Sequence, residues 1–528
     1  MTELLPLKAT FAPGEPVEVE LRGGARPVRV SLWRLDELVA EVEVGPGESV
    51  ARFPAQPEGG YGVEAPEART ALDVLADPLS RARYGFVSDY AAGRGTAGVA
   101  DNVRRLHLNA VQFYDWMYRH AQLLPPADDF VDALGRSLSL DSVRRLAAAV
   151  CGAGSLPLGY AAVYAAGVDE WPAWREDGLY RASGEPWMLG DFLWNVDPTS
   201  ERWLTHFAAD LEASLAAVGF AGFHLDQYGA PKVALRADGT PVDLADAFPA
   251  LIDRLARELP QARLIFNNVN DFPTWSTAAA DQAAVYIEVW SPHDRLADLA
   301  RLVEKARLLA PRQSVILAAY LSVYAGDSGE EAACAAQDIL LATAFSHGAT
   351  PLLHGEERAA LTEAYYVTHA ELSDASMAAA RRYWDFAVRY GDLLFERDAV
   401  DVTRTHLGGV NEDLKIEAPV PVSTGARAGA LWARVVKLPH GLLVSLVDLS
   451  AQPDDLWDSP KRPGSPLAGV HVSVERRRSG ITRFLFASPD DTPALLELHP
   501  GADGRYDTVE LPPFRTWAIL WLPDEVAA

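Results

Sequence analysis

The chain has 528 residues, which is too long for one hydrophobic core and predicts two to four domains. Its 47 basic and 73 acidic residues give a net charge of −26, and such an acidic surface disfavours nucleic acid and anionic membranes as partners. The only cysteines, Cys151 and Cys334, supply neither a disulfide framework nor a spaced metal site, and both are expected to be buried in helices.

The first 78 residues alternate between apolar and polar positions, with turn residues between the runs. This period of two predicts a small antiparallel sandwich of immunoglobulin-like size, with strands at 17–21, 28–33, 42–44 and 61–64. The N-terminus lacks the basic start and apolar stretch of a signal peptide. As written, the chain is therefore expected to be cytoplasmic, or secreted if a leader has been removed.

Residues 79–396 change to apolar strands that alternate with amphipathic helices, the pattern of a parallel sheet. Eight such units predict a central (β/α)8 barrel. The stretch from Asp169 to Asp197 is expected to form a loop over the active-site face, and the stretch from Glu357 to Glu396 a long helical region. The predicted strands are 84–87, 110–114, 158–163, 222–225, 264–267, 285–288, 314–318 and 351–354.

From residue 397 to 528 the sequence returns to strands and turns. Apolar runs at 430–436, 441–447 and 516–521 predict a C-terminal antiparallel β-sandwich. The expected architecture is thus a multidomain chain, in which the barrel is flanked by an N-terminal immunoglobulin-like β-sandwich and a C-terminal antiparallel β domain.

Two carboxylates end predicted barrel strands. Asp226 follows the fourth strand and Glu288 ends the sixth, the position where barrel enzymes carry their catalytic groups. Glycoside hydrolysis needs one ionised and one protonated carboxyl group. Asp226, with Gln227 and Tyr228 beside it as donors, suits the nucleophile, whereas the apolar neighbours of Glu288 favour a raised pKa and the role of acid/base. Two structural carboxylates that cap helices are the competing interpretation.

Aromatic and planar polar side chains at other strand ends are typical of sugar subsites. The segment after the second strand carries several of them, although aromatic rings at strand ends are also common in cores. The amides after the fifth strand bind hydroxyls or cap loops, and the two histidines are either ligands or core residues. Tyr164 and Asp197 are further candidates for the walls of the cleft. The predicted substrate-binding residues are Gln112, Tyr114, Asp115, Trp116, His120, Tyr160, Asn195, His224, Gln227, Asn267, Trp290 and His354.

Between about residues 75 and 400 the sequence resembles glycoside hydrolase family 66, the dextranases and cycloisomaltooligosaccharide glucanotransferases. The resemblance rests on the segments 83–90, 112–116, 219–229, 288–290 and 382–386. It implies an Asp nucleophile and a Glu acid/base, roles that fall on Asp226 and Glu288. It also implies an α-1,6-glucan or oligosaccharide substrate, and no metal or other cofactor is expected.

Two departures from the family affect the expected activity. The chain lacks the leader of exported members, and the roughly thirty residues between Ala318 and Leu352 leave no room there for the carbohydrate-binding module of cyclising members. A retaining, dextranase-like hydrolase is therefore favoured. The alternatives are a cycloisomaltooligosaccharide glucanotransferase or another α-1,6 transglucosylase, and, from a different class, a non-catalytic glucan-binding protein.

Overall fold

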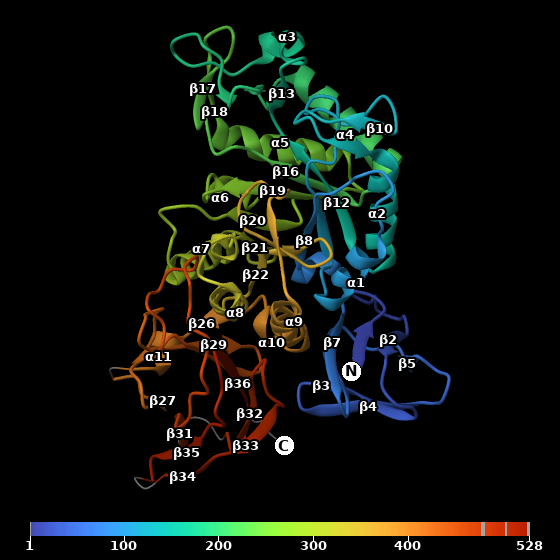
Figure 1. Ribbon diagram of the computed structural model, residues 1–528. Helices are drawn as coiled ribbons and strands as arrows, with labels where there is room; N and C mark the ends of the chain where they lie inside the picture. Colours follow the sequence, from blue (N-terminus) through green and yellow to red (C-terminus); the bar gives the residue numbers. More distant parts are fainter. Residues whose placement is uncertain (1, 409, 477–480, 502–503, 525–528) are drawn as a thin grey trace.

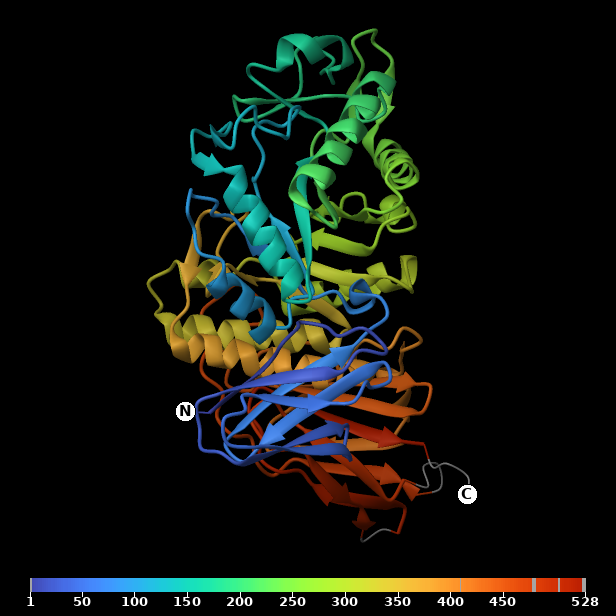
Figure 2. The ribbon, with the colours of Figure 1, turned by 90° about the vertical axis from the view of Figure 1, so that its right-hand side faces the viewer.

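The computed structural model describes residues 2–408, 410–476, 481–501 and 504–524. A central region of parallel strands and helices lies between a set of small hairpins and two regions of antiparallel strands (Figure 1). The two antiparallel regions come from the two ends of the chain and lie side by side against the same part of the central region (Figure 2). The molecule is thus multidomain, as predicted, while the exact domain boundaries stay a prediction.

The N-terminal region consists of two antiparallel sheets, because its apolar residues recur at every second position. In β2, for example, Val17, Val19 and Leu21 are buried and the residues between them are half-buried. These residues form a separate hydrophobic cluster with Val30, Leu32 and their neighbours on the second sheet. One sheet contains β1 (Glu3–Pro6), β2 (Val17–Arg22) and β5 (Val50–Phe53); the other contains β4 (Glu37–Val44), β3 (Val28–Arg34), β6 (Gly59–Ala65) and β7 (Ala68–Val74).

The main strands of the central sheet are parallel and follow the chain from strand to strand, as expected for strands linked by helices. Seven of its strands were predicted within a few residues of their observed bounds. They are β8 (Tyr84–Val87), β9 (Ala110–Phe113), β12 (Leu156–Ala162), β16 (Gly222–Asp226), β19 (Arg263–Val269), β20 (Ala284–Glu288) and β21 (Ser314–Ala318).

The eighth predicted strand is broken in two. β22 (Ala349–Leu352) pairs with β21, whereas β23 (His354–Gly355) pairs with β8, so the sheet curls back toward its first strand. Gly355 lies opposite Phe86, and a Cβ atom at this glycine would lie 2.3 Å from the Phe86 carbonyl oxygen. The close approach of the two backbones therefore requires glycine.

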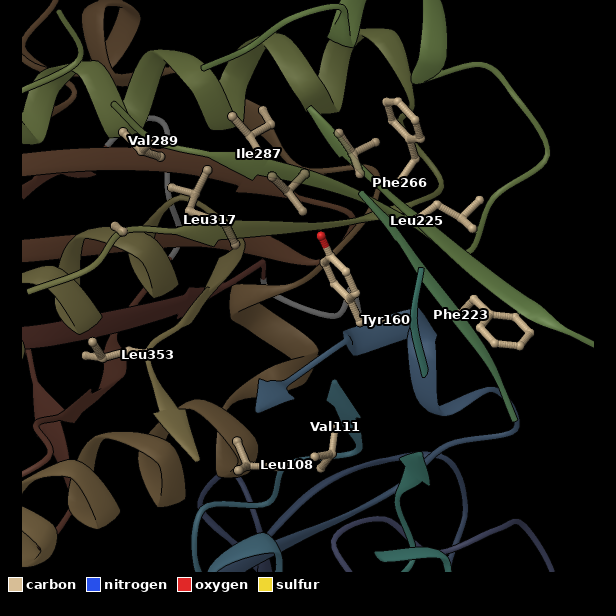
Figure 3. Close-up of a cluster of buried hydrophobic side chains, with 14 of the residues drawn as sticks. Leu108, Val111, Tyr160, Phe223, Leu225, Phe266, Ile287, Val289, Leu317 and Leu353 are labelled. Atoms are coloured by element: carbon tan, nitrogen blue, oxygen red, sulfur yellow. The ribbon is translucent and has the colours of Figure 1, made fainter. Parts of the chain in front are cut away.

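Helices cover the outside of the curled sheet. In Figure 3, Phe266 and Ile287 point from their strands toward a neighbouring helix, whereas Tyr160 points into the space between the strands. Phe266 contacts Phe248 of α5, with ring centroids 5.1 Å apart. The long helices are α1 (Ala97–Arg105), α2 (Leu140–Gly152), α4 (Glu201–Val218), α5 (Leu244–Glu258), α7 (Leu296–Leu309), α8 (Glu330–Ser346) and α9 (Asp374–Arg389).

Two expectations about helices are wrong. The stretch from Glu357 to Glu396 is not helical throughout, because its first part forms β24 (Ala359–Leu361) and β25 (His369–Glu371), which extend the central sheet beyond β23; α9 and α10 (Gly391–Leu394) follow. Cys151 is exposed and Cys334 half-buried. Cys151 lies in the last turn of α2, where the buried positions are Leu146, Ala147 and Val150.

The C-terminal region contains two antiparallel sheets, and all three predicted strands are present as β29 (Leu431–Leu438), β30 (Gly441–Asp448) and β36 (Trp517–Pro523). The sheet that contains β29, β30 and β36 packs with one face on the second sheet of this region. Trp517, on the other face, packs on Phe345 of α8 and Phe386 of α9. Within the described residues, no helix has the length and hydropathy needed to cross a membrane.

Candidate active site

A cavity of about 470 Å³ lies where the carboxyl ends of the parallel strands meet, and both predicted catalytic carboxylates line it. Asp226 is the last residue of β16 and Glu288 the last residue of β20, so the strand pairing fixes where each backbone lies. Met188–Leu189 (β14) and Leu193–Asn195 (β15) belong to the predicted loop of 169–197, and Leu189, Phe192 and Leu193 of this hairpin line the cavity. This loop therefore lies over the site, as expected.

The two carboxylates share one hydrogen-bond donor. Nδ2 of Asn267 donates to Oδ1 of Asp226 at 2.7 Å and to Oε2 of Glu288 at 3.0 Å. Since both oxygens bond the same nitrogen, they lie no further apart than the sum of these distances, about 5.7 Å. Retaining glycosidases have carboxyl groups about 5–5.5 Å apart, whereas inverting enzymes need roughly 6.5–9.5 Å. The geometry fits the first class.

Each carboxylate also accepts a hydrogen bond from its own tyrosine. The hydroxyl of Tyr160, on β12, donates to Oδ2 of Asp226 at 2.7 Å, and the hydroxyl of Tyr320, just after β21, donates to Oε1 of Glu288 at 2.9 Å. Gln227 and Tyr228 were expected to be hydrogen-bond donors beside Asp226. Gln227 donates to Asp226 through its main-chain N–H, while its side-chain amide donates to the carbonyls of Asn267 and Phe272.

Burial raises the pKa of both carboxyl groups. For Asp226 burial and then the nearby charge of Glu288 raise the pKa to about 7, against the hydrogen bonds from Tyr160 and Asn267. For Glu288 burial is the main cause, and Asn267, Tyr320 and Trp290 oppose it. A raised pKa was predicted for Glu288 alone. Because the two groups lie so close in one buried site, ionisation of one disfavours ionisation of the other, and the two titrate as a coupled pair.

Most of the predicted substrate-binding residues line the same cavity. The residues found there are Gln112, Tyr114, Asp115, His120, Tyr160, His224, Gln227, Asn267 and Trp290. Among the described residues, several buried polar atoms of this lining have no hydrogen-bond partner: Oε1 of Gln112, Nδ1 of His120, Oη of Tyr228 and Oδ1 of Asn267. Buried polar groups are rarely left unpaired without a reason, so these atoms are suited to bind the hydroxyl groups of a ligand.

Burial shifts the pKa values of Asp115 and of two histidines that line the cavity, His120 and His224. Burial raises the pKa of Asp115 to about 7 although Arg136 opposes it, and the Asp115 backbone has a φ of 48°. Burial lowers the pKa of His120 to about 4 and that of His224 to about 3. Both histidines are therefore neutral near pH 7 and able to accept as well as donate a hydrogen bond.

Three predicted contacts lie outside the cavity. Trp116 is fully buried between strand and helix, where its indole donates to the Tyr160 carbonyl and packs on Phe220. His354 is also fully buried and bonds Gln337 of α8 and Trp384 of α9. Asn195 ends β15 within the loop of 169–197 and is buried there. The partners of Trp116 and His354 lie on the helix side of the central sheet.

The two further wall candidates have structural partners as well. Tyr164 accepts from the main-chain N–H of Tyr228, and Asp197 forms an ion pair with Arg236 at 2.6 Å. Neither lines the cavity.

Sequence reasoning missed Tyr320 and Tyr366. Tyr320 follows β21 as the other site residues follow their strands, a signal that was available. Tyr366 lies between β24 and β25, in the stretch wrongly expected to be helical, and its ring stacks on Tyr114 with centroids 4.3 Å apart. Within the described residues, no group of three or more His, Cys, Asp or Glu side chains is placed to hold a metal ion.

A curled parallel sheet with two closely spaced carboxylates in a cavity at its strand ends is the arrangement of a glycoside hydrolase. The family model of glycosyl hydrolase family 66 matches residues 7–520. The chain therefore belongs to family 66 and is an enzyme of the glycoside hydrolase type.

Two curated relatives are cycloisomaltooligosaccharide glucanotransferases of Niallia circulans, 27% identical over 296 residues and 24% identical over 288 residues. The matches cover 50% and 48% of this chain but 30% and 29% of the relatives, so this chain accounts for less than a third of their length.

Solved structures with a similar fold include a Paenibacillus cycloisomaltooligosaccharide glucanotransferase complexed with cycloisomaltoheptaose. It has a TM-score of 0.87 and 18% identity, and the match covers 99% of this chain and 100% of that one. A maltogenic alpha-amylase from Thermotoga neapolitana is more distant, with a TM-score of 0.54 and 10% identity over 85% of this chain and 100% of that one.

Proposed function

We propose that this chain is a retaining enzyme acting on α-1,6-glucans, which forms a covalent glycosyl-enzyme on Asp226 and transfers the glycosyl group to a sugar hydroxyl. Its substrate is an isomaltooligosaccharide or dextran chain, as the names of its curated relatives suggest. The fold that carries this activity is a (β/α)8 barrel between an N-terminal immunoglobulin-like and a C-terminal antiparallel β-sandwich. No cofactor is needed for this chemistry.

The observation that carries the proposal is the single amide nitrogen between the two carboxylates. The distance of at most about 5.7 Å between their bonded oxygens is shorter than the spacing at which an inverting enzyme holds a water between its general base and the sugar. Asp226 is therefore assigned the attack on the anomeric carbon, and Glu288 the proton that releases the leaving oxygen. Glu288 then takes a proton from the incoming acceptor hydroxyl.

Hydrolysis is the second candidate. The sequence favoured a dextranase because the segment between β21 and β22 is too short for an inserted binding module, and the structure fills this segment with the 3-10 turn Ser322–Tyr324 and α8. The curated relatives support transfer instead, so transfer becomes the main proposal. Both reactions pass through the same intermediate and differ only in whether water or a sugar attacks it.

Azide rescue tests the assigned roles. In Glu288→Ala, an aryl α-glucoside with a good leaving group needs no acid, so the glycosyl-enzyme still forms, and azide should intercept it to give the α-glucosyl azide. In Asp226→Ala, azide should attack from the vacated side and give the β-glucosyl azide. The opposite stereochemistry in the two variants would reverse the roles of the two carboxylates.

Product analysis separates transfer from hydrolysis. The wild-type enzyme is incubated with isomaltotriose, dextran, maltotriose and pullulan, and the products are separated by chromatography. We expect larger or cyclic α-1,6-linked products from the first two substrates and none from maltotriose. Glucose or short linear oligosaccharides as the sole products at high sugar concentration would favour the hydrolase.

A further inference from the structure

Three buried tyrosine hydroxyls form a continuous chain that ends on Glu288. The hydroxyl oxygen of Tyr286 lies 3.0 Å from that of Tyr366, which lies 3.2 Å from that of Tyr320, and Tyr320 bonds Oε1 of Glu288. All three rings are at most 5% exposed. They come from β20, from the loop between β24 and β25, and from the residues after β21.

A tyrosine hydroxyl both donates and accepts, so such a chain can run in either direction. When Glu288 is ionised, Tyr320 donates to it, Tyr366 donates to Tyr320 and Tyr286 donates to Tyr366. When Glu288 carries a proton on Oε1, it donates to Tyr320, and each hydroxyl rotates to donate to the next. Every hydrogen bond between neighbouring groups is kept in both states and only its direction changes. No covalent O–H bond of a tyrosine is broken.

Only the carboxylate oxygens that face a tyrosine hydroxyl have a partner able to change from donor to acceptor. Each carboxylate also accepts from N–H groups, which cannot become acceptors: the Asn267 amide serves both, the Gln227 main chain serves Asp226 and the Trp290 indole serves Glu288. A proton on the oxygen that faces such a donor sacrifices a hydrogen bond in a buried site, which is costly. A proton on either carboxylate is therefore best placed on the oxygen that faces a tyrosine hydroxyl, Oδ2 of Asp226 or Oε1 of Glu288.

We propose that the hydroxyl chain Tyr286–Tyr366–Tyr320 is a reversible positioning device that lets Glu288 act first as proton donor and then as proton acceptor. Its catalytic meaning rests on the proposed role of Glu288 as acid/base. The other titratable and polar groups that face Glu288 are Tyr114 just after β9, Tyr160 of β12, His224 and Asp226 of β16, Asn267 of β19 and Trp290 just after β20.

Opposite effects are expected from the two hydroxyls nearest Glu288. Tyr320→Phe removes the donor to the charged carboxylate, which weakens the ionised form most, so Glu288 should titrate about one pH unit higher. Tyr366→Phe leaves Tyr320 donating to the carboxylate but removes the group to which Tyr320 must donate when Glu288 is protonated. Glu288 should then titrate at lower pH. Phenylalanine keeps the ring packing in both variants.

The test is infrared difference titration of the Glu288 carboxyl band, identified by its loss in Glu288→Gln, in the full-length protein. Tyr90→Phe is the matched control, because Tyr90 is equally buried and its hydroxyl donates to the Val87 carbonyl. Shifts of opposite sign for Tyr320→Phe and Tyr366→Phe, with none for Tyr90→Phe, support the chain. Shifts of the same sign, or none, overturn it.

Because the titration needs no turnover, it separates this inference from the proposed function. If the enzyme does not act on α-1,6-glucans but the two variants shift the titration in opposite directions, the inference about the hydroxyl chain stands and the proposed substrate is wrong. Conversely, if the enzyme is active but both variants titrate like the wild type, the proposed function stands and the inference about the hydroxyl chain is wrong. In an active enzyme, the alkaline limb of kcat/KM should move in the same direction as the infrared midpoint.

Discussion

At the scale of single residues, Asp226 links catalysis to stability through its protonation. Its pKa is raised from 3.8 to about 7 in the folded protein. Between these pH values the folded state binds more protons than the unfolded state, so the stability contributed by this group falls as the pH rises from about 4 to about 7. The active site is therefore kept at a cost in stability at neutral pH, where a charge must be buried.

This cost can be measured with Asp226→Asn, which keeps the shape of the side chain but carries no charge. One pKa unit corresponds to about 1.4 kcal/mol, so the variant should be more stable than the wild type by a few kcal/mol at pH 8 and no more stable at pH 4. Thermal unfolding followed at both pH values gives the comparison. Asp327→Asn, at an exposed position, is the control and should leave the pH dependence unchanged. Equal stability of Asp226→Asn and wild type at pH 8 would contradict the raised pKa.

At the scale of elements, the β14–β15 hairpin supplies an apolar rim to the cavity. Leu189 and Phe192 are 41% and 37% exposed although both line the site. Exposed apolar side chains beside a cavity are suited to cover a sugar ring beyond the two carboxylates. Under the proposed function, we expect the hairpin to contact the distal units of a longer glucan chain.

We expect Phe192→Ala to raise KM about tenfold for long isomaltooligosaccharides and much less for isomaltotriose, since the lost apolar contact is worth about 1–2 kcal/mol. Steady-state kinetics with a series of chain lengths measures the effect. Val168→Ala removes an exposed apolar side chain of the same loop region that does not line the cavity, and it serves as the control. A KM increase that is independent of chain length would show that Phe192 has no distal role.

At the scale of the whole molecule, a buried ion pair connects the N-terminal sandwich to the central region. Arg83, just before β8, bonds Asp73 of β7 at 2.7 and 3.0 Å, and both side chains are only 1% exposed. The same guanidinium donates to the carbonyl of His107 and the hydroxyl of Thr10. Removing the carboxylate leaves a buried charge without its partner.

Asp73→Ala should therefore lower the free energy of unfolding by about 3–5 kcal/mol, whereas turnover well below the unfolding temperature stays near that of the wild type. Urea unfolding followed by fluorescence and circular dichroism measures the loss. The exposed pair Arg52–Glu18 in the same sandwich offers the control, and Glu18→Ala should cost less than about 1 kcal/mol. If both variants lost equally little stability, the buried pair would not connect the regions energetically.

The sequence by itself determined the strands and the two strand-end carboxylates. Period-two runs and short apolar runs bounded by glycine depend on local chemistry, and Asp226 and Glu288 follow from the ends of such runs. Only the tertiary structure decided what surrounds them. Asn267 bridges the pair, and Tyr366 reaches it from a stretch expected to be helical, because the curled sheet joins strand ends far apart in sequence. The sequence also did not reveal the direction of every side chain, because this depends on tertiary packing: Trp116 packs on Phe220, and His354 bonds Gln337 of α8 and Trp384 of α9.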